Sequence, residues 1–161
     1  MRLLTASLIL ALALPAAASA QNAGQIASAR RGQSCPGCNL FQADFAGLEL
    51  KGRNFAGARL RQADLSLSVM NRTNFARSDL RDVNAYGAVF SSASFAGADL
   101  THASLVGTYL EGANFAGARL EGTNFSGAEM DRAVGLSQAQ LNQACGDAST
   151  QLPRGLRIPA C

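Results

Sequence analysis

Large apolar residues recur at every fifth position across residues 38–132. The series consists of leucine, phenylalanine or methionine from Leu40 to Met130, with Ala85 as its exception. The residue two positions earlier is small in most units, and the other three positions are mainly polar, charged or glycine. A period of five matches neither an α-helix, at about 3.6 residues, nor a β-strand, at about 2, so the pattern indicates an internal repeat. One unit is too short to bury its large side chain, so the nineteen units must stack.

A second period, of twenty residues, is superimposed on the first. Phenylalanine recurs in steps of twenty from Phe55 to Phe115, and leucine recurs in the same way from Leu40 to Leu120. Four units per coil would place like residues above one another at the spacing of paired strands, about 4.8 Å. The sequence therefore predicts an all-β solenoid with four sides and about five coils.

Individual units resemble a known family. Residues 43–45 (Ala-Asp-Phe), 63–65 (Ala-Asp-Leu) and 113–115 (Ala-Asn-Phe) are similar to the Ala-(Asp/Asn)-Leu-x-x pattern of pentapeptide-repeat proteins, and the resemblance covers about 60% of the chain. It implies a right-handed four-sided β-helix in which the central residue and the small residue two before it point inward. Ten units end in glycine, which we expect to ease the backbone through corners that need a positive φ.

Two places depart from the repeat. Val83 is large where a small residue is expected, and Ala85 is small where a large one is expected, so the volume of that unit is roughly conserved. Leu48 and Arg53 are oversized for inward positions in the first coil. Because a buried unpaired arginine is costly, we expect Arg53 to turn toward the N-terminal end of the solenoid and this coil to be irregular.

The two ends of the chain predict export and capping. Residues 1–20 have the pattern of a secretory signal peptide, with Arg2, an apolar core over residues 3–14 and a small-residue cleavage site that ends at Ala20. The apolar run is too short to favour a membrane anchor. We therefore expect cleavage after Ala20 and a bacterial protein exported to the periplasm. Residues 21–37 would cover the first coil, and residues 133–161, with a short helix over 137–145, would cover the last.

Four cysteines are present, and an exported chain favours disulfides. The solenoid would be about 20 Å tall, whereas the Cα atoms of a disulfide lie within about 7 Å. This predicts one disulfide at each end, Cys35–Cys38 and Cys145–Cys161, the second tying down the C-terminal tail. The sequence Cys-Pro-Gly-Cys at residues 35–38 also allows a thiol-disulfide redox pair, although such a pair normally stands at a helix start in an α/β domain, and none is predicted here.

Composition favours a non-catalytic protein. The chain has one histidine, His102, so it has few residues that could form a nucleophile paired with a general base. No cofactor or metal motif is visible. The formal net charge of +3 is too mild to indicate nucleic acid or, for the mature form, a membrane. The charge is unevenly distributed, because residues 51–81 carry seven basic and two acidic side chains, whereas residues 82–131 carry six acidic and one basic.

One group of outward positions is apolar. These residues fall around one vertical edge of the predicted solenoid: Leu67, Val69, Tyr86, Val89, Val106 and Tyr109. A contiguous apolar group suggests an interaction site, although β-branched and aromatic residues also favour strand ladders. A flat side with asparagine and alanine, including Asn74 and Ala96, is a weaker candidate.

Our leading interpretation is a non-catalytic exported scaffold that binds a protein partner, or itself as a homodimer, through this edge. The family resemblance offers a second hypothesis, because some relatives mimic DNA and bind topoisomerases. That role requires a strongly acidic surface and a cytoplasmic target, which this sequence does not predict. A redox protein using Cys35 and Cys38 is the third hypothesis.

Overall fold

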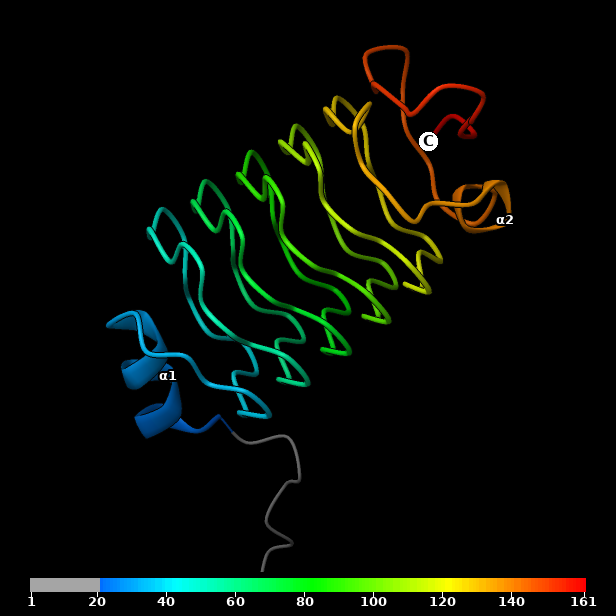
Figure 1. The fold of residues 1–161 in the computed structure, drawn as a ribbon. Helices are drawn as coiled ribbons and strands as arrows, with labels where there is room; N and C mark the ends of the chain where they lie inside the picture. The colour runs from blue at the N-terminus through cyan, green and yellow to red at the C-terminus, as the bar shows by residue number, and fades with distance from the viewer. Residues whose placement is uncertain (1–20) are drawn as a thin grey trace, which may run out of the picture.

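The chain forms a stack of coils with a short helix at each end (Figure 1). The computed structural model describes residues 21–161, so the predicted signal peptide and its cleavage site lie outside the described residues. Helix α1 (Ala23–Arg30) lies at one end of the stack and helix α2 (Gln138–Leu141) at the other. Each turn of the backbone in Figure 1 runs alongside the previous one, as a solenoid requires.

The period of twenty residues is the pairing register of the coils. Parallel bridges join residues twenty apart along the repeat, from Asn39↔Arg59 to Tyr109↔Glu129. Within one such contact, Phe45 N donates to Asp64 O at 2.7 Å, and Asp64 N donates to Ala43 O at 2.9 Å. Each five-residue unit contributes a single bridge residue, because the chain enters a two-residue turn directly after the central residue that follows the bridge. The predicted all-β character is therefore present as isolated bridges, and no longer strand is assigned within residues 21–161.

The corners of the coils require a positive φ. The last residue of the unit has a φ between 54° and 68° at ten glycines and at eight other residues of the repeat. At one of these corners Ser68 N donates to Leu65 O at 3.2 Å across the turn. This is the geometry in which the third residue of a type II turn has a positive φ. The predicted role of the glycines is thus correct, and the eight other residues each adopt a conformation that costs about 1–2 kcal/mol without glycine.

The interior is filled by the central residues and the small residues two positions before them. Phe75, Phe95 and Phe115 stack nearly parallel, with ring centroids 5.4 Å and then 5.1 Å apart. Phe90 meets Phe95 edge to face at 5.4 Å. Inward hydroxyls are also bonded, since Ser68 Oγ donates to Leu65 O at 2.7 Å. The core is therefore a continuous column that leaves each coil dependent on its neighbours.

The substitutions within the repeat are accommodated in two different ways. Val83 and Ala85 are both buried, which agrees with the predicted exchange of volume. Leu48 is half-buried and Arg53 is exposed, with its guanidinium against Gly32 at the N-terminal end, as expected. The predicted irregularity of this coil is wrong: Val69 N still donates to Leu48 O at 2.9 Å, and Asn74 N to Arg53 O at 2.8 Å. Arg53 turns outward and Leu48 packs half-buried against the core, and the backbone register is unchanged.

The N-terminal cap provides hydrogen-bond partners for backbone groups at the open edge of the first coil. Asn22 caps α1 by accepting a hydrogen bond from Gln25 N at 3.1 Å. Gln25 Oε1 in turn accepts from Asn39 N at 2.7 Å, and Arg30 bonds Asp44 O and pairs with its carboxylate at 3.3 Å. Ala29 of α1 is fully buried and belongs to the hydrophobic core. These contacts remove backbone groups that would otherwise form an unpaired edge.

The coil register begins one unit before the predicted boundary at residue 38. Cys35 N donates to Asn54 O at 2.8 Å, and Gly37 N donates to Ala56 O at 2.9 Å. Pro36 and Gly37 form a corner, with φ of +68° at Gly37, and the disulfide Cys35–Cys38 joins the two ends of that corner with Cα atoms 5.5 Å apart. The Cys-Pro-Gly-Cys sequence is thus a closed corner of the solenoid.

The C-terminal cap continues the backbone pairing of the coils further than the sequence predicts. The expected helix over residues 137–145 is wrong in length, because α2 ends at Leu141. The chain then returns to the solenoid, and the bridges Asn124↔Cys145 and Glu129↔Gln151 continue the pairing. Pairing with the coil below satisfies these backbone groups in place of further helical bonds.

Candidate interaction surface

Two adjacent columns of the solenoid carry the apolar edge. At the corner lie Tyr86 and Val106, which are twenty residues apart, together with Leu67, which stacks on Gly87 next to Tyr86. The adjacent column consists of the bridge residues Val69, Val89 and Tyr109. Bridges Val69↔Val89 and Val89↔Tyr109 place the second column in register. The structure therefore brings the six predicted residues together over three consecutive coils. We refer to these six residues as the apolar edge.

The side chains of the apolar edge are open to solvent to different degrees. Leu67 is 62% exposed, Tyr86 is 56% exposed and Tyr109 is 47% exposed, whereas the three valines are half-buried. Within residues 21–161, neither tyrosine hydroxyl has a hydrogen-bond partner. Large apolar side chains with free polar tips are typical of protein interfaces.

Leu67 is exposed in a strained backbone conformation. Its φ is +56°, at a corner position that is glycine in ten units of the repeat. Its side chain lies over the next coil, so closely that a Cβ added at Gly87 would stand 2.9 Å from Leu67 Cδ2. Neither turn geometry nor core packing requires a leucine there. The corner itself needs the positive φ, and seven other non-glycine residues of the described repeat share it, but among these eight only Leu67 has an apolar side chain. An exposed leucine held in a strained conformation is therefore a candidate functional residue.

The bridge residues of the edge also lack a local hydrogen bond that other sides possess. On the flat side, Asn54 Oδ1 accepts from Ala56 N at 3.0 Å, and Asn74 Oδ1 accepts from Ala76 N at 2.9 Å. A side-chain oxygen two residues before the donor stabilises a turn in this way. This bond explains why the repeat prefers Asp or Asn at this position, so the asparagines of the flat side have a structural role. Valine cannot make the bond, so the valines of the edge have no such explanation.

Charged side chains flank the bridge column at both ends. Toward the N-terminal end lie Arg72, exposed and without an ion pair in the described chain, and Lys51, whose Nζ is 3.1 Å from Glu49 Oε2. Toward the C-terminal end, Tyr109 borders a shallow recess that contains four charged side chains. The charged residues lining it are Glu111, Glu129, Asp131 and Arg132, and Arg132 pairs with Glu111. The two ends of the edge therefore differ in charge.

The other candidate residues are not gathered into a site. His102 is exposed, with its Nδ1 4.0 Å from Asp82 Oδ1. No cluster of three potential metal-binding side chains occurs within residues 21–161. In the same region no helix has the length and hydropathy needed to span a bilayer. Both cysteine pairs are disulfides at the ends of the solenoid, and Cys35 follows α1 and does not stand at a helix start.

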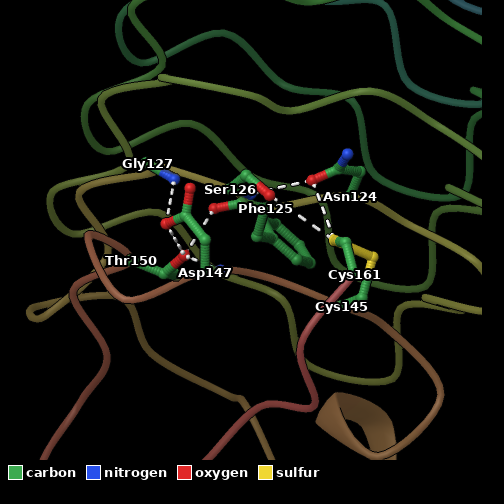
Figure 2. The surroundings of a disulfide bond; sticks show 8 residues. All are labelled: Asn124, Phe125, Ser126, Gly127, Cys145, Asp147, Thr150 and Cys161. Carbon is green, nitrogen blue, oxygen red and sulfur yellow. Dashed lines mark hydrogen bonds between the residues drawn. A yellow bond between two sulfur atoms is a disulfide. The ribbon is translucent and has the colours of Figure 1, made fainter.

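The C-terminal disulfide is held by polar contacts of the last coils (Figure 2). Cys145 and Cys161 are joined with Cα atoms 4.8 Å apart, and Cys161 Sγ lies 3.3 Å from Asn124 Oδ1. In Figure 2, Asp147 lies on the other side of Phe125 from this disulfide, directed at Gly127 and Thr150. Asp147 Oδ1 accepts from Gly127 N at 3.0 Å, and its bonds to neighbouring hydroxyl and backbone groups lower its pKa to about 2. These contacts fasten the tail and do not form a binding cavity.

Comparisons with known proteins identify the repeat. The family model described as pentapeptide repeats matches eight copies, over residues 38–75, 54–91, 68–105, 93–132 and 103–145. A search among curated proteins finds no match.

Solved structures similar to this chain include two cyanobacterial proteins and a resistance protein. The pentapeptide repeat protein Rfr23 from Cyanothece 51142 is 21% identical, over 80% of this chain and 97% of that chain, with a TM-score of 0.46. The protein alr5209 from Nostoc Pcc 7120 is 22% identical, over 85% and 88%, with a TM-score of 0.43. QnrB1, a plasmid-mediated fluoroquinolone resistance protein, is 17% identical, over 80% and 88%, with a TM-score of 0.28. The repeat match extends over more than half of the sequence, and this chain belongs to the pentapeptide-repeat family.

Proposed function

We propose that this protein is a non-catalytic exported scaffold that binds protein through the apolar edge. In this proposal the scaffold is a right-handed four-sided β-helix of about five coils, and the mature protein acts in the bacterial periplasm after cleavage behind Ala20. The apolar edge carries the proposal, because six outward apolar residues adjoin over three coils and one of them, Leu67, is both exposed and strained. Exposed apolar groups of this kind mark interaction sites.

Two other functions receive less support. A DNA-mimicking protein that binds a topoisomerase needs a strongly acidic surface, whereas this chain has a formal net charge of +3 and an N-terminal segment typical of export. A thiol-disulfide enzyme needs a thiolate stabilised at a site such as a helix N-terminus. Cys35 is instead buried at a corner of the first coil.

Photo-crosslinking in the producing cell tests the proposed interface. Tyr86 is replaced by a photoreactive phenylalanine derivative, which preserves an aromatic side chain at an exposed corner. Ala96, the equivalent corner position two units further along the chain, receives the same derivative as control. We expect a discrete adduct from position 86 and none from position 96. If abundant, folded protein gives no adduct from position 86, the apolar edge is not an interface and the proposal is wrong.

A further inference from the structure

We propose that the partner at the apolar edge is a second copy of this chain, packed side by side with its solenoid axis antiparallel. This inference rests on the proposed function, since it names the occupant of the same surface. The order of residues along the edge and the charges that flank it both favour a second copy as the occupant.

The apolar edge is self-complementary about the level of Tyr86 and Val89. In the bridge column, Val69 lies one coil before Val89 and Tyr109 lies one coil after it. A two-fold axis perpendicular to the solenoid at this level would place Val69 of one copy opposite Tyr109 of the other, with Val89 opposite itself. At the corner the same axis would place Leu67 opposite Gly107, next to Val106, with Tyr86 opposite itself. An isologous dimer requires such a surface, in which residue i meets j while j meets i.

The flanking charges select the antiparallel arrangement. The N-terminal half of the surface carries two cations and one carboxylate, Lys51, Arg72 and Glu49, and the C-terminal half carries three carboxylates and one cation: Glu111, Glu129, Asp131 and Arg132. The two-fold axis would bring Arg72 opposite Glu111 and Lys51 opposite Asp131 of the second copy. A parallel dimer would bring the basic half opposite the basic half and the acidic half opposite the acidic half, which is repulsive.

One pair opposes this arrangement and is partly neutralised. Glu49 would face the level of Glu129 in the second copy. Glu49 is paired with Lys51 at 3.1 Å, so the two charges largely cancel within their own chain, and Arg72 remains as the net positive charge of the N-terminal half. The net electrostatic interaction across the interface is therefore between a basic half and an acidic half, and it is attractive.

The size of the surface indicates a weak dimer. The apolar edge covers three coils, a height of about 10 Å at one strand spacing per coil. An interface of this kind falls in the small class, below about 1,200 Å², in which complexes are transient. We therefore expect association in the micromolar range, reversible on dilution.

Sedimentation velocity of the chain with both disulfides formed tests the dimer. Over about 5 to 500 µM, we expect the sedimentation coefficient to rise with concentration as dimer forms. Leu67→Gly should weaken the association tenfold or more, because it removes the most exposed apolar side chain. Arg77→Gly is the matched control, since Arg77 occupies the same corner position in the same coil, with the same φ of +56°, away from the edge.

Charge reversal tests the orientation. Arg72→Glu should weaken the dimer about fivefold, and combining it with Glu111→Arg should restore much of the affinity, whereas Arg77→Glu should leave it unchanged. Oxidation of a mixture of Val69→Cys and Tyr109→Cys chains should give a crosslinked heterodimer. A crosslinked homodimer of Val69→Cys as the main product would overturn the antiparallel arrangement.

The outcomes separate this inference from the proposed function. A chain that stays monomeric up to about 500 µM, or a dimer that Leu67→Gly does not weaken, overturns the inference. If such a chain still gives an adduct with a different protein from position 86 in the cell, the edge binds a foreign partner and the proposed function stands. If position 86 gives no adduct at all, both are wrong.

Discussion

Single residues in this fold are constrained by the volume of the column into which they point. Val83 and Ala85 exchange large and small within one unit, and both are buried. The backbone at this unit keeps the common register, since Asn84 N donates to Ala63 O at 3.1 Å. The repeat consensus therefore describes the volume of a unit and not the identity of each inward side chain.

We predict that this pair is energetically coupled. Ala85→Leu alone should destabilise the fold by about 1–3 kcal/mol through overpacking, and Val83→Ala alone should cost about 1–3 kcal/mol through a cavity. The double variant restores the consensus pattern, so its loss should be clearly smaller than the sum of the two. Urea unfolding of the four chains measures the coupling. Strict additivity would show that the two positions do not share a common volume.

Asp147 is a second residue whose role can be isolated. Its pKa is lowered to about 2 from an ordinary value of 3.8, chiefly by the hydrogen bonds from Ser149 and Gly127 N. A lowered pKa in the folded state means that the ionised carboxylate stabilises the fold. This contribution is complete above about pH 4 and is lost as the pH falls toward about 2.

Asp147→Asn provides the test. Asparagine retains an acceptor oxygen but lacks the charge, so the variant should be less stable than the parent chain at pH 7. The difference in the free energy of unfolding should shrink as the pH falls from about 4 to about 2. Comparing the two chains removes the effect of other carboxylates such as Asp79, whose pKa Arg81 also lowers. A difference that is constant with pH would contradict the assigned role.

At the scale of elements, the two caps distinguish the ends of the solenoid, because the coils between them repeat one another. The C-terminal cap is fastened by the capping-box helix α2, by pairing at Cys145 and by the disulfide to Cys161. Gln140 Nε2 adds two bonds of 2.9 Å to carbonyl oxygens of the coil below, at Phe115 and Ala118. The last coil is thus held by three independent kinds of contact.

We predict that the two disulfides contribute differently to the stability of the fold. Replacing Cys145 and Cys161 together by serine should cost about 3 kcal/mol, since the cross-link joins residues sixteen apart. The same change at Cys35 and Cys38 should cost about 2 kcal/mol, because the loop is shorter and the corner already contains Pro36 and Gly37. Thermal unfolding of each double variant measures both losses. A larger loss at the N-terminal pair would indicate that it does more than close a corner.

Whether a part of the molecule can be predicted from sequence depends on how far apart in the chain the residues that form it lie. The repeat period determines which side chains point inward, so the phenylalanine stack and the apolar edge can both be located from sequence. At the C-terminal end the sequence predicts a cap and a disulfide but not the pairing of Cys145 with Asn124, because that pairing depends on open backbone groups of the last coil. The strain at Leu67 can be inferred from the sequence, because glycine at the same position of ten units indicates a corner with a positive φ.

At the scale of the whole molecule, the separation of charge along the solenoid makes association sensitive to salt. Residues 51–81 carry an excess of basic side chains and residues 82–131 an excess of acidic ones. In the antiparallel dimer these regions face each other, so screening should oppose association. Raising the ionic strength from about 0.1 M to about 1 M shortens the screening length from about 10 Å to about 3 Å.

We therefore predict that the dimer weakens several-fold across this range of sodium chloride concentration, measured by sedimentation velocity. The Arg72→Glu variant, in which one attractive contact has become repulsive, should lose less affinity with salt or even gain some. An association driven by the apolar residues alone would behave differently, because salts that strengthen burial would strengthen it. A wild-type dimer that tightens with salt would thus retain the apolar edge as its interface but contradict the charge pairing that sets its orientation.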